Sequence, residues 1–189
     1  MTARVLTRAY FNRPTLTVAR SLIGKYLVRK RGRRTVAARI VEVEAYIGME
    51  DRACHASKGR TARTDVMFGP AGVSYVYLIY GMHHCFNIVT ERAGFPSAVL
   101  VRAIEDDETQ ALIDGPGRVC RFLAIDRELN RMDLTEGRAL WVEDRGKRVV
   151  PGMIATGRRI GVGYAGDWAK KPWRFRLVSG EKAHVKGKR

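Results

Sequence analysis

The stretch Ile40-Val41-Glu42-Val43-Glu44-Ala45-Tyr46 decides how the rest of the chain is interpreted. Apolar and polar residues alternate along it, which predicts a half-buried strand with Val41, Val43 and Ala45 on one face and Glu42, Glu44 and Tyr46 on the other. Strands disfavour glutamate, yet two glutamates here share a face with an aromatic ring. The pattern fits either a solvated strand face or a rigidly held carboxylate that activates water beside a planar substrate.

The segments around this strand predict one domain, residues 1–189, built from strands, hairpins and a few helices. One helix is expected between Pro14 and Gly24, and another is expected to begin at Gly115-Pro116. A short helix capped near Asp51 is also expected. Strands are expected at residues 25–30, 35–46, 73–80, 85–90, 97–104, 139–142 and 170–177, with a hairpin loop at 81–84 and a short basic tail from about residue 180.

The charge of the chain points to a polyanionic partner. Its 189 residues hold 35 Lys and Arg against 19 Asp and Glu, a net charge of +16. Nucleic acid is the first candidate partner and an anionic membrane surface the second. No run of eighteen apolar residues is present and the first residues lack the apolar core of a secretory signal, so we expect a cytoplasmic protein. The three cysteines are expected to be reduced thiols.

Several exposed-looking residues suit contacts with DNA. Tyr80 precedes a glycine at a hairpin tip, where an aromatic side chain can protrude and enter a base stack. Met82 and His83 flank it. The polar, glycine-containing loop at residues 58–64 carries Arg60 and Arg63, which are placed to contact a ligand or phosphates.

Two polar residues lie in apolar strands and need partners there. Asn87 must find hydrogen bonds if it is buried. Arg102 is costly in the run from Ser97 to Ile104 unless it is paired, and Glu44 or Glu42 is its expected partner. The Cys54-His55 and His83-His84-Cys85 groups match no common zinc-ligand spacing, so we expect no zinc site there.

Taken together, these motifs resemble the alkyladenine (3-methyladenine) DNA glycosylase family, in the compact form of its bacterial members. The resemblance runs from about Ala9 to Phe175, with the motifs in family order. They are VEVEAY (41–46), EDRACH (50–55), YVYLIYGM (75–82), FN (86–87), LVRA (100–103), GPGR (115–118), RIGVG (159–163) and GDWAKKP (166–172). His83 departs from the pattern, because relatives often carry an aromatic residue there.

The resemblance implies an α+β fold, a compact single domain with a curved antiparallel sheet and peripheral helices. It implies a monofunctional enzyme that flips alkylated or deaminated purines out of duplex DNA and hydrolyses the N-glycosidic bond, without metal or cofactor. Glu44 is similar to the general base and Arg102 to the residue that holds the attacking water. The remaining matches are to the base-pocket residues Tyr46, His55, Tyr77 and Asn87 and to the minor-groove residue Tyr80.

Two other classes of protein remain open at the level of the residues themselves. A non-catalytic basic domain that binds nucleic acid would share the charge, but it has no use for a carboxylate that faces a phosphate-binding groove. A membrane-surface protein would need a sustained basic amphipathic helix, which the sequence lacks. We therefore expect a monomeric bacterial enzyme of DNA base excision repair, associated with the nucleoid through DNA. The ranking of hypoxanthine, 3-methyladenine, 7-methylguanine and etheno-adenine as substrates stays open.

Overall fold

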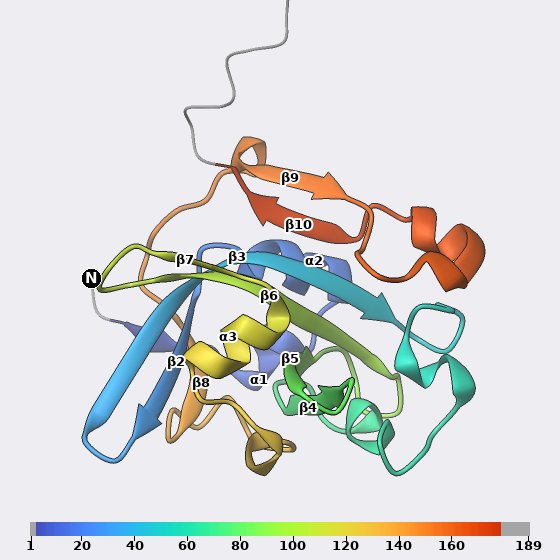
Figure 1. Ribbon diagram of the computed structural model, residues 1–189, viewed down its shortest axis with the longest axis horizontal. Helices are drawn as coiled ribbons and strands as arrows, with labels where there is room; N and C mark the ends of the chain where they lie inside the picture. Colours follow the sequence, from blue (N-terminus) through green and yellow to red (C-terminus); the bar gives the residue numbers. More distant parts are fainter. Residues whose placement is uncertain (1–2, 179–189) are drawn as a thin grey trace, which may run out of the picture.

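The computed structural model describes residues 3–178, in which one antiparallel sheet organises the chain (Figure 1). Its order is β1-β8-β2-β3-β6-β5-β4, with β10 paired to β3 and β9, and β7 paired to β6. The strands are β1 (Arg4–Val5), β2 (Tyr26–Arg31), β3 (Arg34–Ile47), β4 (Ser74–Ile79), β5 (His83–Val89), β6 (Ser97–Asp106), β7 (Leu112–Asp114), β8 (Leu140–Asp144), β9 (Ile154–Gly157) and β10 (Arg174–Leu177).

The helices are short and lie around the sheet. The α-helices are α1 (Arg8–Phe11), α2 (Thr15–Leu22) and α3 (Pro116–Phe122), and the 3₁₀ segments are η1 (His55–Lys58), η2 (Asp65–Phe68), η3 (Arg127–Leu129), η4 (Pro151–Met153) and η5 (Gly163–Lys170). No helix within residues 3–178 is long and apolar enough to cross a membrane. The α+β class and the antiparallel sheet with peripheral helices are confirmed.

The helix α2 shows why the sequence folds as expected at this point. Its buried residues are Thr15, Val18, Ala19 and Leu22, spaced so that they share one face. That face packs on β3 and β6, the two long strands that run side by side through the middle of Figure 1. Gly24 ends the helical segment with a φ of +86°, a conformation that favours glycine.

The strand β3 carries an irregularity that the alternating pattern does not reveal. Ile40 pairs with Ile104 and Glu42 with Ala103, so Val41 is an additional residue on β3; Val43 then pairs with Val101, which leaves Arg102 additional on β6. Such bulges bend a strand and redirect its side chains. Ile40, Val43 and Ala45 enter the main core, whereas Val41 lines a separate cavity. The expectation that Val41 shares the face of Val43 and Ala45 was therefore wrong.

Two smaller apolar clusters meet at the end of β3, and their junction positions the candidate site. One contains Cys54, Met67 and Tyr75, and the other contains Ala53, Val162 and Ala165. Tyr46 packs against both clusters. The last residues of β3 are therefore held from two sides by segments that are distant in the sequence.

Three local expectations were wrong. The strand expected at residues 170–177 begins only at Arg174, because Gly163–Lys170 forms η5. His83 and His84 belong to β5 and pair with Ile79 and Leu78, because the turn that precedes them is tighter than expected. Asp51 does not cap a helix; its carboxylate accepts hydrogen bonds from the Ile47 and Ala53 amides and joins a buried ion pair. The basic tail expected from about residue 180 lies outside the described residues.

Candidate active site

A cavity of about 250 Å³ opens where β4, β5 and β6 meet the end of β3 and the loop before η5. Most of its wall is aromatic or apolar, and a few polar groups converge on it, as in small-molecule sites generally. Six of the predicted residues line it, namely Tyr46, His55, Tyr77, Tyr80, Asn87 and Arg102.

Glu44 lies directly behind this wall, fully buried with an exposed fraction of 0%. Its Oε2 accepts a hydrogen bond from the Tyr46 hydroxyl at 2.7 Å, and its Oε1 accepts one from the Ile160 amide at 2.8 Å. Burial raises the pKa of Glu44, while Arg102, the Ile160 amide and the Tyr46 hydroxyl oppose the rise. The result is a carboxylate of increased basicity that is held by three residues of the cavity wall.

Arg102 stands at the bulge of β6 and carries the positive charge of the site. Its Nε lies 3.2 Å from Glu42 Oε1 and 3.4 Å from Glu44 Oε1. The expected pairing is confirmed, and both candidate acids take part. The bulge is what allows Arg102 to reach the two acids of β3 and the cavity at the same time.

The aromatic wall is built by η1 and β4. The rings of His55 and Tyr77 meet edge to face with centroids 4.6 Å apart, and His55 Nδ1 lies 2.8 Å from the Tyr75 hydroxyl oxygen. Burial, with the nearby Arg63 charge, lowers the pKa of His55 to about 4. The imidazole is therefore neutral at physiological pH, which suits a wall against which a cationic base can stack.

Asn87 is buried in β5 and lines the cavity with a fixed side chain. Its Nδ2 donates to the Tyr75 carbonyl at 3.1 Å and to the Cys85 carbonyl at 3.4 Å. The prediction that a buried Asn87 must find partners is confirmed. Both bonds restrain the amide, so it cannot easily move aside for a bulkier ligand.

Tyr80 protrudes from the β4–β5 hairpin with 85% of its surface exposed. Tyr80 and Gly81 have positive φ angles of 52° and 68°, and the Met82 amide donates to the Ile79 carbonyl at 3.1 Å. Because Ile79 pairs with His83, the loop consists of Tyr80, Gly81 and Met82. A tyrosine in this conformation is strained, which is typical of a position selected for function.

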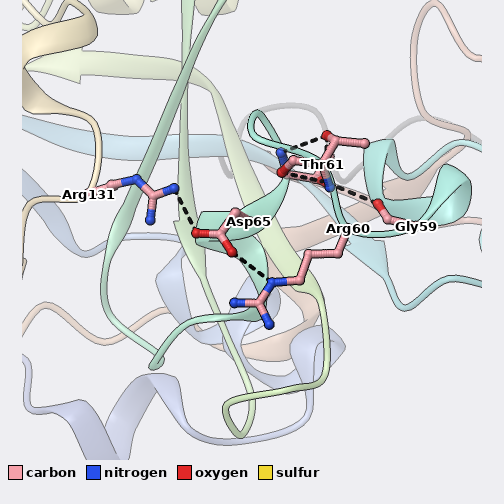
Figure 2. Close-up of polar contacts among 6 residues, drawn as sticks. Gly59, Arg60, Thr61, Asp65 and Arg131 are labelled. Atoms are coloured by element: carbon pink, nitrogen blue, oxygen red, sulfur yellow. Dashed lines mark hydrogen bonds and ion pairs between the residues drawn. The ribbon is translucent and has the colours of Figure 1, made fainter.

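The other predicted DNA-contacting residues lie outside the cavity. Met82 and His83 border a second, shallow depression beside α3, where the His83 side chain lies next to Gly117. Arg60 donates from Nε to Asp65 at 2.7 Å, and Arg131 donates to the same carboxylate at 2.8 Å, as Figure 2 shows. Arg63 is exposed, and its charge adds to the effect of burial in lowering the pKa of His55.

A buried ion pair that was not among the predicted site residues supports the site. The side chains of Arg159 and Asp51 are completely buried and form a bidentate ion pair, with N–O distances of 2.5 and 2.8 Å. The guanidinium also lies 4.8 Å from the Tyr46 ring centroid. The pair fixes the chain next to Ile160, the residue whose amide binds Glu44. Asp51 stands between Glu50 and Arg52, and Arg159 follows Arg158, so nothing in the sequence singles out these two charges as a pair.

Tyr164 was also absent from the predicted set. It lines the rim of the cavity with 73% of its surface exposed. A single tyrosine in a glycine-rich loop carries no pattern from which this position could be inferred. Within residues 3–178, no group of three or more His, Cys, Asp or Glu side chains is arranged to hold a metal ion.

Comparison with known protein sequences places this chain in a family. Residues 9–181 match the sequence profile of the methylpurine-DNA glycosylase family. The chain is 51% identical to a "Putative 3-methyladenine DNA glycosylase" of Myxococcus xanthus, over 95% of this chain and 92% of the relative. It is 51% identical to a protein of the same description from Methanocella arvoryzae (90% and 91% covered) and 48% identical to one from Legionella pneumophila (91% and 93%). The chain belongs to the methylpurine-DNA glycosylase family, enzymes that release alkylated purines from DNA.

Proposed function

We propose that this protein flips alkylated and deaminated purine nucleotides out of duplex DNA and hydrolyses their N-glycosidic bonds, which leaves abasic sites. The observation that carries the proposal is the position of Glu44. This residue is a fully buried carboxylate, paired with Arg102, directly behind an aromatic-walled cavity. Family membership supports the alkylated substrates, and the extension to deaminated purines is part of the proposal.

Glu44 is the proposed general base, and Arg102 helps to hold the attacking water. A base works best when its pKa lies close to the working pH, and burial moves the pKa of Glu44 upward in that direction. Cleavage of the bond builds positive charge on the sugar. A neighbouring carboxylate in the low-dielectric interior of the protein stabilises that charge as well.

Tyr46, His55 and Tyr77 are the proposed walls around the flipped base. Aromatic faces stack on any purine and attract an alkylated, cationic purine further, by roughly 0.5–2 kcal/mol. The neutral state of His55 supports this role, because an imidazolium would repel such a base. Burial also raises the pKa of Tyr46 and of Tyr77, so both rings stay uncharged.

Asn87 is the proposed gate against normal guanine. Guanine carries an exocyclic 2-amino group, which hypoxanthine lacks, and a restrained amide in the cavity wall would clash with that group. The two hydrogen bonds that fix the Asn87 amide support the assignment. The same reasoning favours hypoxanthine, the deaminated form of adenine, as a second substrate.

Tyr80 is the proposed wedge that fills the gap left by the flipped nucleotide. Flipping costs a few kcal/mol, least at damaged or mispaired bases, and an inserted side chain replaces part of the lost stacking. Its exposure at the tip of the β4–β5 hairpin beside the cavity supports this role. Met82, His83, Arg60 and Arg63 are proposed to contact the DNA around it, and the net charge of +16 favours binding to the phosphate backbone.

The test is single-turnover excision on two labelled duplexes, one with hypoxanthine and one with 3-methyladenine. Wild type is expected to produce alkali-labile sites on both duplexes, and Glu44→Gln on neither, with duplex affinity retained. Excision of 3-methyladenine alone would refute the deaminated substrate. Full turnover by Glu44→Gln would remove Glu44 from the base role. Tight binding without excision by wild type would favour the alternative, a non-catalytic nucleic-acid-binding domain.

A further inference from the structure

Glu42 is an acid next to the site to which no role has yet been assigned. It precedes Glu44 by two residues on β3 and is 6% exposed. It does not line the base cavity. It lines a different cavity, of about 440 Å³, which is neither the base cavity nor the depression beside α3. Its Oε1 lies 3.2 Å from Arg102 Nε and 3.6 Å from Arg174 Nη1.

The two glutamates do not share Arg102 equally. The Nε–H of Arg102 makes a hydrogen bond to Glu42, whereas Glu44 lies at ion-pair distance, 3.4 Å, without one. Within residues 3–178 the Nη nitrogens of Arg102 make no hydrogen bond to protein atoms, although the residue lines the base cavity. The guanidinium is therefore fixed at Nε, and its other donors remain for groups inside the cavity.

We infer that Glu42 is a positioning residue, which holds Arg102 by its Nε–H so that the Nη donors serve the water and the substrate while Glu44 stays free to accept a proton. This inference rests on the proposed roles of Glu44 and Arg102. Without Glu42, the nearest acceptor for Arg102 is Glu44 itself. A bidentate ion pair between Arg102 and Glu44 would occupy the carboxylate lone pairs that Glu44 needs to act as the general base.

The charged and titratable groups around Glu44 and Glu42 determine how the excision rate should depend on pH. Glu44 is faced by Arg102, Tyr46 and Glu42, with Tyr77 and Cys85 across the cavity. Glu42 is faced by Arg102 and Arg174, and its cavity also holds Arg39, Glu105, Asp114 and Arg176. The negative charge of Glu42 contributes to the raised pKa of Glu44. Its removal should therefore lower the pH at which Glu44 loses its proton.

The variants are Glu42→Ala, which removes charge and acceptor, and Glu42→Gln, which keeps an acceptor. Glu105→Gln is the matched control, because Glu105 pairs with Arg39 across the same two strands at 2.7 Å but lies outside the base cavity. Misplaced catalytic groups typically lose on the order of 10- to 100-fold in rate. Glu42→Ala should lose that much in the single-turnover rate, Glu42→Gln less, and Glu105→Gln less than twofold.

Two further readouts separate positioning from mere stability. The acid limb of the rate profile should move to lower pH in both Glu42 variants and stay in place in Glu105→Gln, and affinity for lesion duplex should change less than about threefold. A wild-type rate in Glu42→Ala, or a lowered rate with an unmoved acid limb, would overturn the inference. Glu44→Gln assayed in parallel distinguishes the two hypotheses. If it is inactive while Glu42→Ala is fully active, only the role of Glu42 fails; if it is active, the proposed base fails.

Discussion

Replacement of Arg159 by methionine should destabilise the protein strongly and slow excision, although this residue lies behind the cavity wall. Methionine keeps much of the aliphatic volume, so the change mainly removes the guanidinium. That group donates to both oxygens of Asp51 and to the carbonyls of Ala45 and Trp168. It also lies 4.8 and 5.0 Å from the ring centroids of Tyr46 and Trp173.

The size of the effect follows from what the substitution leaves behind. Asp51 would remain fully buried, with only the amides of Ile47 and Ala53 as donors. Removal of one partner from a buried ion pair costs about 3–5 kcal/mol, mostly because the other charge loses its counter-charge. For a chain of this size, 4 kcal/mol corresponds to a fall in Tm of roughly 8–16 °C. The apolar pair Asp51→Leu/Arg159→Met should lose less than the single variant, since no charge is left unpaired.

Urea unfolding at neutral pH would measure the loss, with the exposed pair Arg138–Glu136 as the comparison. Glu136→Gln should change the free energy of unfolding by less than about 1 kcal/mol, because exposed ion pairs contribute little. Excision should slow in Arg159→Met even where the protein is folded, since Ile160 and Tyr46 lose the group that fixes them beside Glu44. A loss below about 1 kcal/mol, or a double variant less stable than Arg159→Met, would refute this account of the pair.

Three further predictions concern pH, backbone strain and salt. Because burial raises the pKa of Glu44, the single-turnover rate should fall with decreasing pH at a higher pH than the ~4.3 of a free glutamate. The same shift means that stability falls as pH rises from the unfolded to the folded pKa, so calorimetry should find Glu44→Gln more stable than wild type at pH 7. Tyr80→Gly removes a strained positive φ and should raise stability by about 1 kcal/mol, yet base-analogue fluorescence should show weaker flipping. In salt titrations of DNA binding, Arg63→Ala should reduce the slope by about one unit, and Arg60→Ala by less, because Asp65 already binds Arg60.

Much of the framework was predictable because apolar periodicity is a local property. The helix α2 buries residues at the spacing that the sequence shows, and the bounds of α2, β2, β3 and β6 agree with expectation within two residues. The pairing of Arg102 with the acids of β3 was predictable as well, since a buried arginine requires a counter-charge.

What was not predictable depends on partners distant in the sequence. The hydrogen bond from Ile160 to Glu44 joins residues 116 positions apart, and an amide donor carries no signature in the sequence. The pair of Asp51 and Arg159 spans 108 positions. The bulge at Val41 and Arg102 arises from how β3 and β6 fit together, and neither strand's own sequence indicates it.

Three unfavourable features of this structure lie together at the base cavity. A fully buried glutamate, a tyrosine with a positive φ and an arginine displaced by a bulge would each be disfavoured in an ordinary sheet. All three lie on or directly behind the wall of the base cavity. Each feature opposes a local preference, and their common position is best explained by chemistry that needs a basic carboxylate, a protruding ring and a fixed cation within one site. The same reasoning assigns Glu42 to that site, because an acid beside a buried acid is costly unless it orients the cation between them.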